Sequence, residues 1–230
     1  MNLQICVPYE KCPFNCPMCI AADRPVFKNS FINDRESYIN KLINIFNSNE
    51  YEYFILTGNT DPTLNKDWLE TVSGILGSKS NKVELQTRNY NLYSYNISNI
   101  GTIAYSIISP KDYFKAWRFR KIDRGNNRLV ILLTKEFDFL NTDNFDSMGF
   151  NEITFKVLQK GISLNQRLYV DNNKMESLDN IYGIIDRYNG TDVSIRIDNN
   201  CQDSHGRYKI FREDGILYNT WEDNPTEGIN

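Results

Sequence analysis

Several features common in other protein classes are scarce or missing from this sequence. No apolar run is long enough to cross a bilayer, and no N-terminal stretch resembles a signal peptide. Five cysteines, three of them closely spaced, do not suggest a secreted disulfide framework. We therefore expect the protein to reside in the reducing cytoplasm. The net charge of −3 and the pI of about 5.3 argue against binding nucleic acid through bulk charge. The single histidine, His205, lies in a polar segment typical of a solvated loop.

Three of the cysteines form a compact run. Cys12, Cys16 and Cys19 stand in a C-x3-C-x2-C spacing. Thiolates are the usual ligands of iron–sulfur clusters, and the chain has one histidine as an alternative ligand. Three cysteines on a 4Fe–4S cluster would leave one of its four irons without a protein ligand. The run therefore predicts a cluster with one iron open to a small molecule.

At these residues the sequence resembles the radical SAM superfamily, whose signature is this spacing. The resemblance implies that S-adenosylmethionine chelates the open iron. Met18 stands where the family usually has an aromatic residue, and we expect it beside the bound cofactor. A second similarity lies at Thr57–Leu64, which follows an apolar strand and resembles the family's Gly-Gly-Glu-Pro segment. It departs from that pattern by one extra residue and by Asp61 in place of Glu.

Strand-type and helix-type segments alternate along most of the chain, whose length and 40% hydrophobic content predict one sizeable domain. The predicted strands are Leu3–Val7, Tyr53–Thr57, Lys82–Thr87, Thr102–Ile108, Arg128–Thr134 and Glu152–Leu158. The predicted helices are Asp34–Phe46, with Asp34 as N-cap, then Lys66–Leu76, Asp112–Lys121 and Met175–Tyr188. This alternation predicts an α/β fold with a parallel sheet that curls toward a barrel. The family's partial (βα)6 TIM-like barrel has the same strand count.

The end of the chain breaks this rhythm. Val193–Ile197 predicts a further strand, and Tyr208–Arg212 and Ile216–Thr220 predict a hairpin around Glu213–Gly215. We therefore expect a barrel over residues 1–190 and a small β extension over residues 191–230.

The resemblance also nominates residues that would contact S-adenosylmethionine. Ligands of parallel α/β barrels bind where the strands end, and both motifs follow strands. The turn of Thr57, Gly58, Asn59, Thr60 and Asp61 would accept hydrogen bonds from the methionine ammonium. Gln86 lies at the third strand end. Ser106 and Ser109 are alternative contacts at the fourth strand, because its register is open. Lys156, in the sixth strand, points into the barrel mouth or outward.

The resemblance implies an enzyme that reductively cleaves S-adenosylmethionine at one 4Fe–4S cluster to a 5′-deoxyadenosyl radical. That radical would abstract a hydrogen atom from a small-molecule or nucleotide substrate. Alternatives are an activase of glycyl-radical enzymes and a peptide-modifying enzyme. A one-electron reductant such as flavodoxin or ferredoxin is the expected partner. A single cluster is predicted because Cys201 is the one cysteine toward the C-terminus.

Two other interpretations of the residues stay open. A zinc-stabilised binding module would need a further ligand to complete the cysteine run, from Cys6 or from the pair Cys201 and His205. A second feature is the basic stretch 113–128, which also carries aromatic residues. It suits a phosphate or nucleotide partner, or else is a solvated helix face with an apolar core side.

Overall fold

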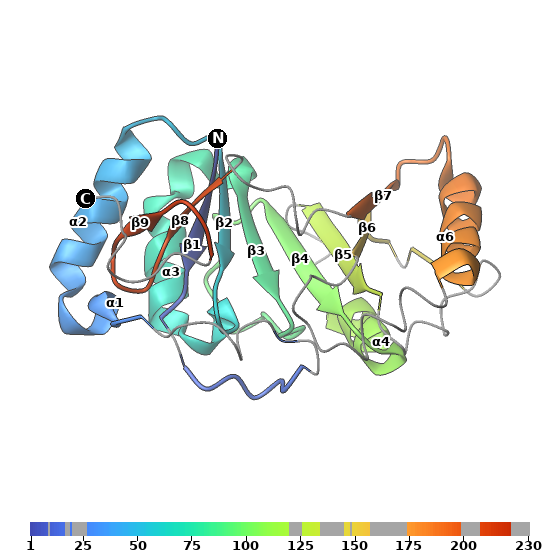
Figure 1. Ribbon diagram of the computed structural model, residues 1–230, viewed down its shortest axis with the longest axis horizontal. Helices are drawn as coiled ribbons and strands as arrows, with labels where there is room; N and C mark the ends of the chain where they lie inside the picture. Colours follow the sequence, from blue (N-terminus) through green and yellow to red (C-terminus); the bar gives the residue numbers. More distant parts are fainter. Residues whose placement is uncertain are drawn as a thin grey trace.

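A mostly parallel sheet, in which the first seven strands are neighbours in chain order, forms the centre of the molecule (Figure 1). The computed structural model describes residues 1–8, 10–16, 19, 27–119, 126–133, 145–147, 149–156, 174–198 and 208–221. The strands are β1 (Asn2–Cys6), β2 (Tyr53–Thr57), β3 (Val83–Thr87), β4 (Thr102–Ile107), β5 (Asn126–Leu132), β6 (Glu152–Lys156), β7 (Ser194–Asp198), β8 (Tyr208–Phe211) and β9 (Leu217–Tyr218). They pair in the order β7-β6-β5-β4-β3-β2-β1-β8-β9, and all pairs except β8–β9 are parallel.

The helices occupy the connections between these strands. They are α1 (Ser30–Asn33), α2 (Arg35–Asn47), α3 (Lys66–Ile75), α4 (Pro110–Phe119) and α6 (Lys174–Tyr188), with 3-10 turns η2 (Pro62–Leu64) and η3 (Gly77–Lys82). As predicted, Asp34 caps α2, since its side chain accepts a hydrogen bond from the Ser37 amide. Among the described residues, no helix combines the length and apolarity that a bilayer crossing requires.

The predicted α/β class with a mostly parallel sheet is confirmed, whereas closure into a barrel stays a prediction. In the described part of the chain, the sheet ends at β7 on one side and at β9 on the other. Strand β5 begins two residues earlier than predicted, because the Asn126 amide donates to the Gly101 carbonyl at 2.7 Å and starts the pairing with β4.

Residues after 190 contribute to both edges of the sheet. Strand β7 pairs with β6, while β8 pairs with β1 at the other side. The predicted hairpin is present as β8 and β9. It packs a second small core of Cys6, Phe27, Ile210 and Tyr218. The fully buried guanidinium of Arg212 lies 3.9 Å from the Phe27 ring centroid, a cation–π contact that fastens the hairpin to the loop before α1.

One face of the sheet carries the main apolar core. Successive side chains of a strand point to opposite faces, so Leu3, Phe54 and Leu85 share one face. They pack in one cluster with residues of α2 and α3, which Figure 1 shows beside and behind the sheet. The indole nitrogen of Trp68 in α3 donates to the hydroxyl of Tyr38 in α2 at 3.0 Å. The two helices are thereby fixed to each other as well as to the sheet.

The opposite face of the sheet carries a charged network near the amino ends of the strands. Glu84 is 2% exposed and accepts hydrogen bonds from Arg128, from the Tyr53 hydroxyl at 3.0 Å and from Gln86 at 2.9 Å. Arg128 also bonds Glu152. Burial and the neighbouring Glu84 carboxylate raise the pKa of Tyr53 to about 12, so its hydroxyl stays a donor. This network therefore occupies the polar face near the amino ends of the strands, away from their carboxyl ends.

We expect Arg128→Met to destabilise the fold by about 3–5 kcal/mol, because Glu84 would keep a buried charge without its cation. Urea unfolding measures the change. Adding Glu84→Gln to this variant should recover much of the loss, since the neutral amide removes the uncompensated charge. A double variant as unstable as Arg128→Met alone would contradict this account.

Candidate functional site

The loop after β1 carries the three closely spaced cysteines at the carboxyl ends of the strands (Figure 1). The Val7 amide donates to the Thr57 carbonyl at 2.8 Å, which extends the pairing of β1 with β2 to the start of this loop. The Cys19 amide donates to the Cys16 carbonyl at 3.0 Å and turns the chain back. Cys12 and Cys16 are half-buried, and Cys19 is exposed. The sequence motif therefore lies at the rim where parallel α/β sheets bind ligands.

Arg88, at the end of β3, holds Cys16 from the side. Its Nη1 donates to the Cys16 Sγ over 2.8 Å, and its Nη2 donates to the Asp112 Oδ2, also over 2.8 Å. The guanidinium lies 5.5 Å from the centroid of the Phe14 ring. Burial raises the pKa of the Cys16 thiol, while the hydrogen bond and positive charge of Arg88 lower it. One side chain thus joins the cysteine loop to the first turn of α4.

The segment after β2 approaches the cysteine loop closely at Gly58. This residue has φ +151°, a conformation that side chains disfavour. A Cβ there would lie 3.0 Å from Val7 Cγ1 and 3.1 Å from the Val7 amide nitrogen. Glycine is therefore required where the segment passes the end of β1. The next residues, Asn59, Thr60 and Asp61, are buried.

Asp61 ties the end of β2 to the end of β3. Its Oδ1 accepts from the Thr63 amide at 3.0 Å and from the Thr63 hydroxyl at 2.7 Å. The Thr87 hydroxyl lies 2.8 Å from Oδ1 and 3.0 Å from Oδ2, and the Arg88 amide donates to Oδ2 over 2.6 Å. Both oxygens are thus engaged within the protein. Its predicted contact with a methionine ammonium stays a prediction.

Two more nominated residues have defined structural partners. Ser109 follows β4 and caps α4, since its hydroxyl accepts from the Asp112 amide at 3.3 Å. Helix α4 consequently begins at Pro110, before the predicted Asp112, because proline suits the first helical position. Gln86 lies on the polar face and donates to Glu84.

The remaining nominated residues lie in different surroundings. Ser106 is half-buried within β4, and its carbonyl accepts from the Tyr90 hydroxyl at 2.7 Å. Lys156 is half-buried at the end of β6, which β4 and β5 separate from β3. Met18 lies outside the described residues. The structure thus gathers the cysteine loop, the Gly58–Asp61 turn and the end of β3, with Lys156 further along the rim.

Sequence reasoning did not assign a site role to Arg88, Thr87 or Asp112. Arg88 directly follows the predicted strand Lys82–Thr87, and this position at a strand end was the available signal. Its partners Cys16 and Asp112 are 72 and 24 residues away, so the bonds themselves depend on the sheet order.

The residues present fit an iron–sulfur cluster in donor chemistry and placement. Three thiols outside any disulfide lie on one loop at the strand ends. A buried hydroxyl, that of Thr60, makes no hydrogen bond in the described structure and is available to a bound group. Among the described residues, no three Cys, His, Asp or Glu side chains converge closely enough to hold a single metal ion. The fit is therefore to the kind of donor and to the loop that carries the donors, not to a converged set of ligands.

Comparison with known proteins supports the fold. No family model and no curated protein matches the chain. It is similar to the crystal structure of Streptococcus suis SuiB bound to the precursor peptide SuiA, with a TM-score of 0.67 and 13% sequence identity. The match covers 97% of this chain and 65% of SuiB, so the chain spans less than two thirds of that protein. The chain therefore shares the α/β fold of SuiB, with its mostly parallel sheet.

Gly58 provides a test of the turn beside the cysteine loop. We expect Gly58→Ala to destabilise the protein by about 1–3 kcal/mol, because the backbone strain adds to the contact with Val7. Gly74→Ala is the matched control, since nothing lies within 4 Å of its Cβ position in α3. It should stabilise the helix by about 0.5–1 kcal/mol. Equal urea midpoints for the two variants would contradict the assigned geometry.

Proposed function

We propose that this protein is a radical SAM enzyme that cleaves S-adenosylmethionine at one 4Fe–4S cluster held by Cys12, Cys16 and Cys19. The observation that carries the proposal is the position of the C-x3-C-x2-C loop. It follows β1 at the carboxyl ends of a parallel sheet and contacts the end of β3 through Arg88. The fold likeness to SuiB, a radical SAM enzyme, supports the same function.

When bound, the cluster and S-adenosylmethionine supply a reactive radical by reductive cleavage of the sulfonium. The chain's own residues position these groups. The three thiolates bind iron, and the close approach at Gly58 brings the backbone of the second motif next to the cysteine loop. The buried Thr60 hydroxyl suits a polar group of the cofactor. Ser106, Gln86 and Lys156 would contact the cofactor or substrate from the strands.

A peptide is the substrate class that we favour. The support is that SuiB, similar over nearly the whole of this chain, was solved with a precursor peptide. The small-molecule or nucleotide substrate has weaker support, because that interpretation rests on the sequence alone. The substrate would bind over the polar face of the sheet, near Lys156, because the other face is filled by the apolar core.

Anaerobic reconstitution tests the reaction class. The protein should hold about four irons per chain and release 5′-deoxyadenosine from S-adenosylmethionine with dithionite. Cys16→Ala should lose iron and activity, whereas Cys6→Ala, which removes a buried cysteine of β1 outside the run, should keep both. Colourless protein with one zinc and no cleavage would support the zinc-module alternative, and loss of metal in Cys6→Ala would identify a fourth ligand.

Deuterium transfer tests the substrate class. Deuterated candidate peptides and deuterated nucleotides are supplied separately, and the label in 5′-deoxyadenosine is measured by mass spectrometry. We expect transfer from a peptide. Transfer from a nucleotide and from no peptide would restore the small-molecule interpretation while leaving the radical chemistry intact.

Arg88 should raise the reduction potential of the cluster, because its positive charge and its hydrogen bond stabilise the more negative, reduced state. We expect Arg88→Met to lower the midpoint potential by about 60 mV, the equivalent of a tenfold change for one electron. Arg88→Lys keeps the charge, so its midpoint potential should lie between those of the native protein and Arg88→Met. Electron paramagnetic resonance during a redox titration measures the shift.

The titration has a direct control. Iron content is determined for each variant, so that a lost cluster is not mistaken for a lowered potential. An unchanged potential in Arg88→Met with four irons bound would show that the contact with Cys16 has no electronic role.

A further inference from the structure

The outer face of α4 carries a row of basic and aromatic side chains. Lys111, Phe114, Lys115 and Arg118 follow the spacing i, i+3, i+4, i+7 and are exposed, so they form one stripe. Phe114 is 61% exposed, and Trp117, beside the stripe, is 48% exposed. Large exposed aromatic residues surrounded by charges are typical of interaction surfaces. We call these five residues the α4 stripe.

The charge of the α4 stripe opposes that of the whole protein. Its three cations lie in a chain of net charge −3. The one acid of α4, Asp112, is 6% exposed and is paired with Arg88, so it does not neutralise the exposed face. The exposed face of α4 therefore carries three positive charges and no acid of its own helix, which suits a partner with an acidic surface.

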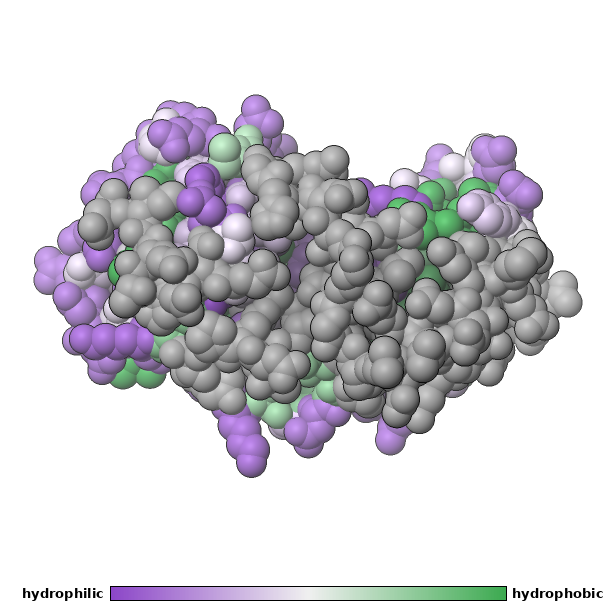
Figure 2. Space-filling view, viewed as in Figure 1, coloured by the Kyte–Doolittle hydropathy of each residue, from purple (hydrophilic) through white to green (hydrophobic). Residues whose placement is uncertain are grey.

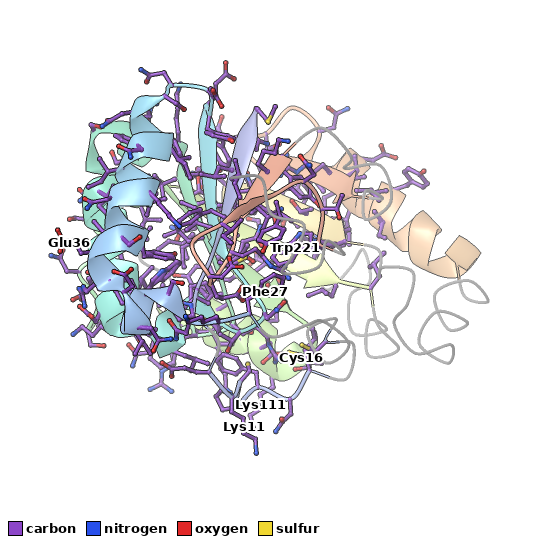
Figure 3. The ribbon with its side chains drawn as sticks, turned by 60° about the vertical axis from the view of Figure 1, so that its left-hand side comes forward. Lys11, Cys16, Phe27, Glu36, Lys111 and Trp221 are labelled. Carbon is purple, nitrogen blue, oxygen red and sulfur yellow. The ribbon has the colours of Figure 1, made fainter. Side chains whose placement is uncertain are left out.

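The α4 stripe begins beside the cysteine loop. Asp112 bonds the Arg88 guanidinium, and the same guanidinium bonds Cys16. Lys111 precedes Asp112, and Figure 3 shows Lys111, Cys16 and Lys11 at the same end of the molecule. Lys11 has the exposed Glu10 as its neighbour, so the two charges of that segment offset each other. Lys111 therefore brings the positive charge of α4 to this end.

The α4 stripe faces away from the region where a substrate would bind. Tyr113 and Ala116 of α4 pack into the apolar core, and the stripe lies on the opposite side of the helix. A substrate on the polar face of the sheet would have the sheet and its core between itself and the stripe. A partner bound to the α4 stripe would therefore lie near the cysteine loop without occupying the polar face of the sheet.

We propose that the α4 stripe is the docking surface for an acidic one-electron donor protein. The proposal rests on the proposed function, because a donor is needed to reduce a cluster at Cys16. One electron leaves the donor, which is oxidised by one electron, and enters the cluster; no bond is made or broken. The cations steer the acidic donor, and Phe114 and Trp117 supply apolar contact.

Charge reversal tests the α4 stripe with an acidic flavodoxin as the probe. Lys115→Glu/Arg118→Glu changes the charge by the same amount as the control Lys41→Glu/Lys82→Glu. Both control residues are exposed, Lys41 in α2 and Lys82 at the last position of η3. Binding of oxidised flavodoxin at low ionic strength should weaken about tenfold or more in the α4 variant. The control should bind as the native protein does. Circular dichroism checks that each variant folds.

A neutral variant and a rate ratio complete the test. Lys115→Gln/Arg118→Gln should weaken binding less than the charge reversal. The second measurement is the ratio of two rates of 5′-deoxyadenosine formation, with reduced flavodoxin and with dithionite. This ratio should fall most in the charge reversal and less in the neutral variant. Equal binding of flavodoxin by the native, α4 and control proteins would overturn the proposal. So would unchanged flavodoxin binding together with lost binding of an acidic peptide or a DNA oligonucleotide, which would assign the stripe to that partner.

The two proposals fail in different ways. Absence of 5′-deoxyadenosine with dithionite counts against the radical SAM function, whatever the flavodoxin result. Cleavage with dithionite, combined with flavodoxin binding that is insensitive to α4 charge, counts against the docking surface alone. Flavodoxin binding needs no turnover, so the surface can be judged in either case.

Discussion

The hydrogen bonds of the Asp61 carboxylate determine how the candidate site is assembled. They join the turn after β2 to the threonine and the backbone that end β3. This fixes the point from which the Arg88 side chain extends to the cysteine loop and to α4. Because charge-assisted hydrogen bonds are strong and directional, one carboxylate can hold the turn after β2 and the end of β3 together. The cysteine loop gains a fixed neighbour even though few of its own residues are buried.

Much of the fold could be predicted because its signals are local. The residues of β2 alternate in burial as a strand requires, and its predicted limits, Tyr53–Thr57, agree with the structure. The cap of α2 by Asp34 was predicted for the same reason. Long-range pairing was beyond such signals: nothing near Tyr208–Phe211 indicates that this strand lies beside β1. Nor does the sequence around Glu84 name Arg128, 44 residues later, as its partner.

The candidate site divides in the same way. The spacing of Cys12, Cys16 and Cys19 could be recognised in the sequence because one loop carries all three. Ser109 stays an alternative to Ser106 as a predicted cofactor contact, and the structure adds a helix-capping role for its hydroxyl. That outcome depended on where β4 ends, which periodicity left undetermined. The resemblance to a family motif nominated Asp61 for a ligand, but not its bonds to Thr87 and Arg88, which require knowing that β2 and β3 are neighbours.

The position of β8 has a consequence for biosynthesis. Strand β1 is synthesised before the other described strands, yet one of its two partners is Tyr208–Phe211. Until those residues emerge, β1 has an open edge at which other chains could pair. The strand that leads into the cysteine loop therefore has one of its two neighbours until residues 208–211 are added, and both afterwards.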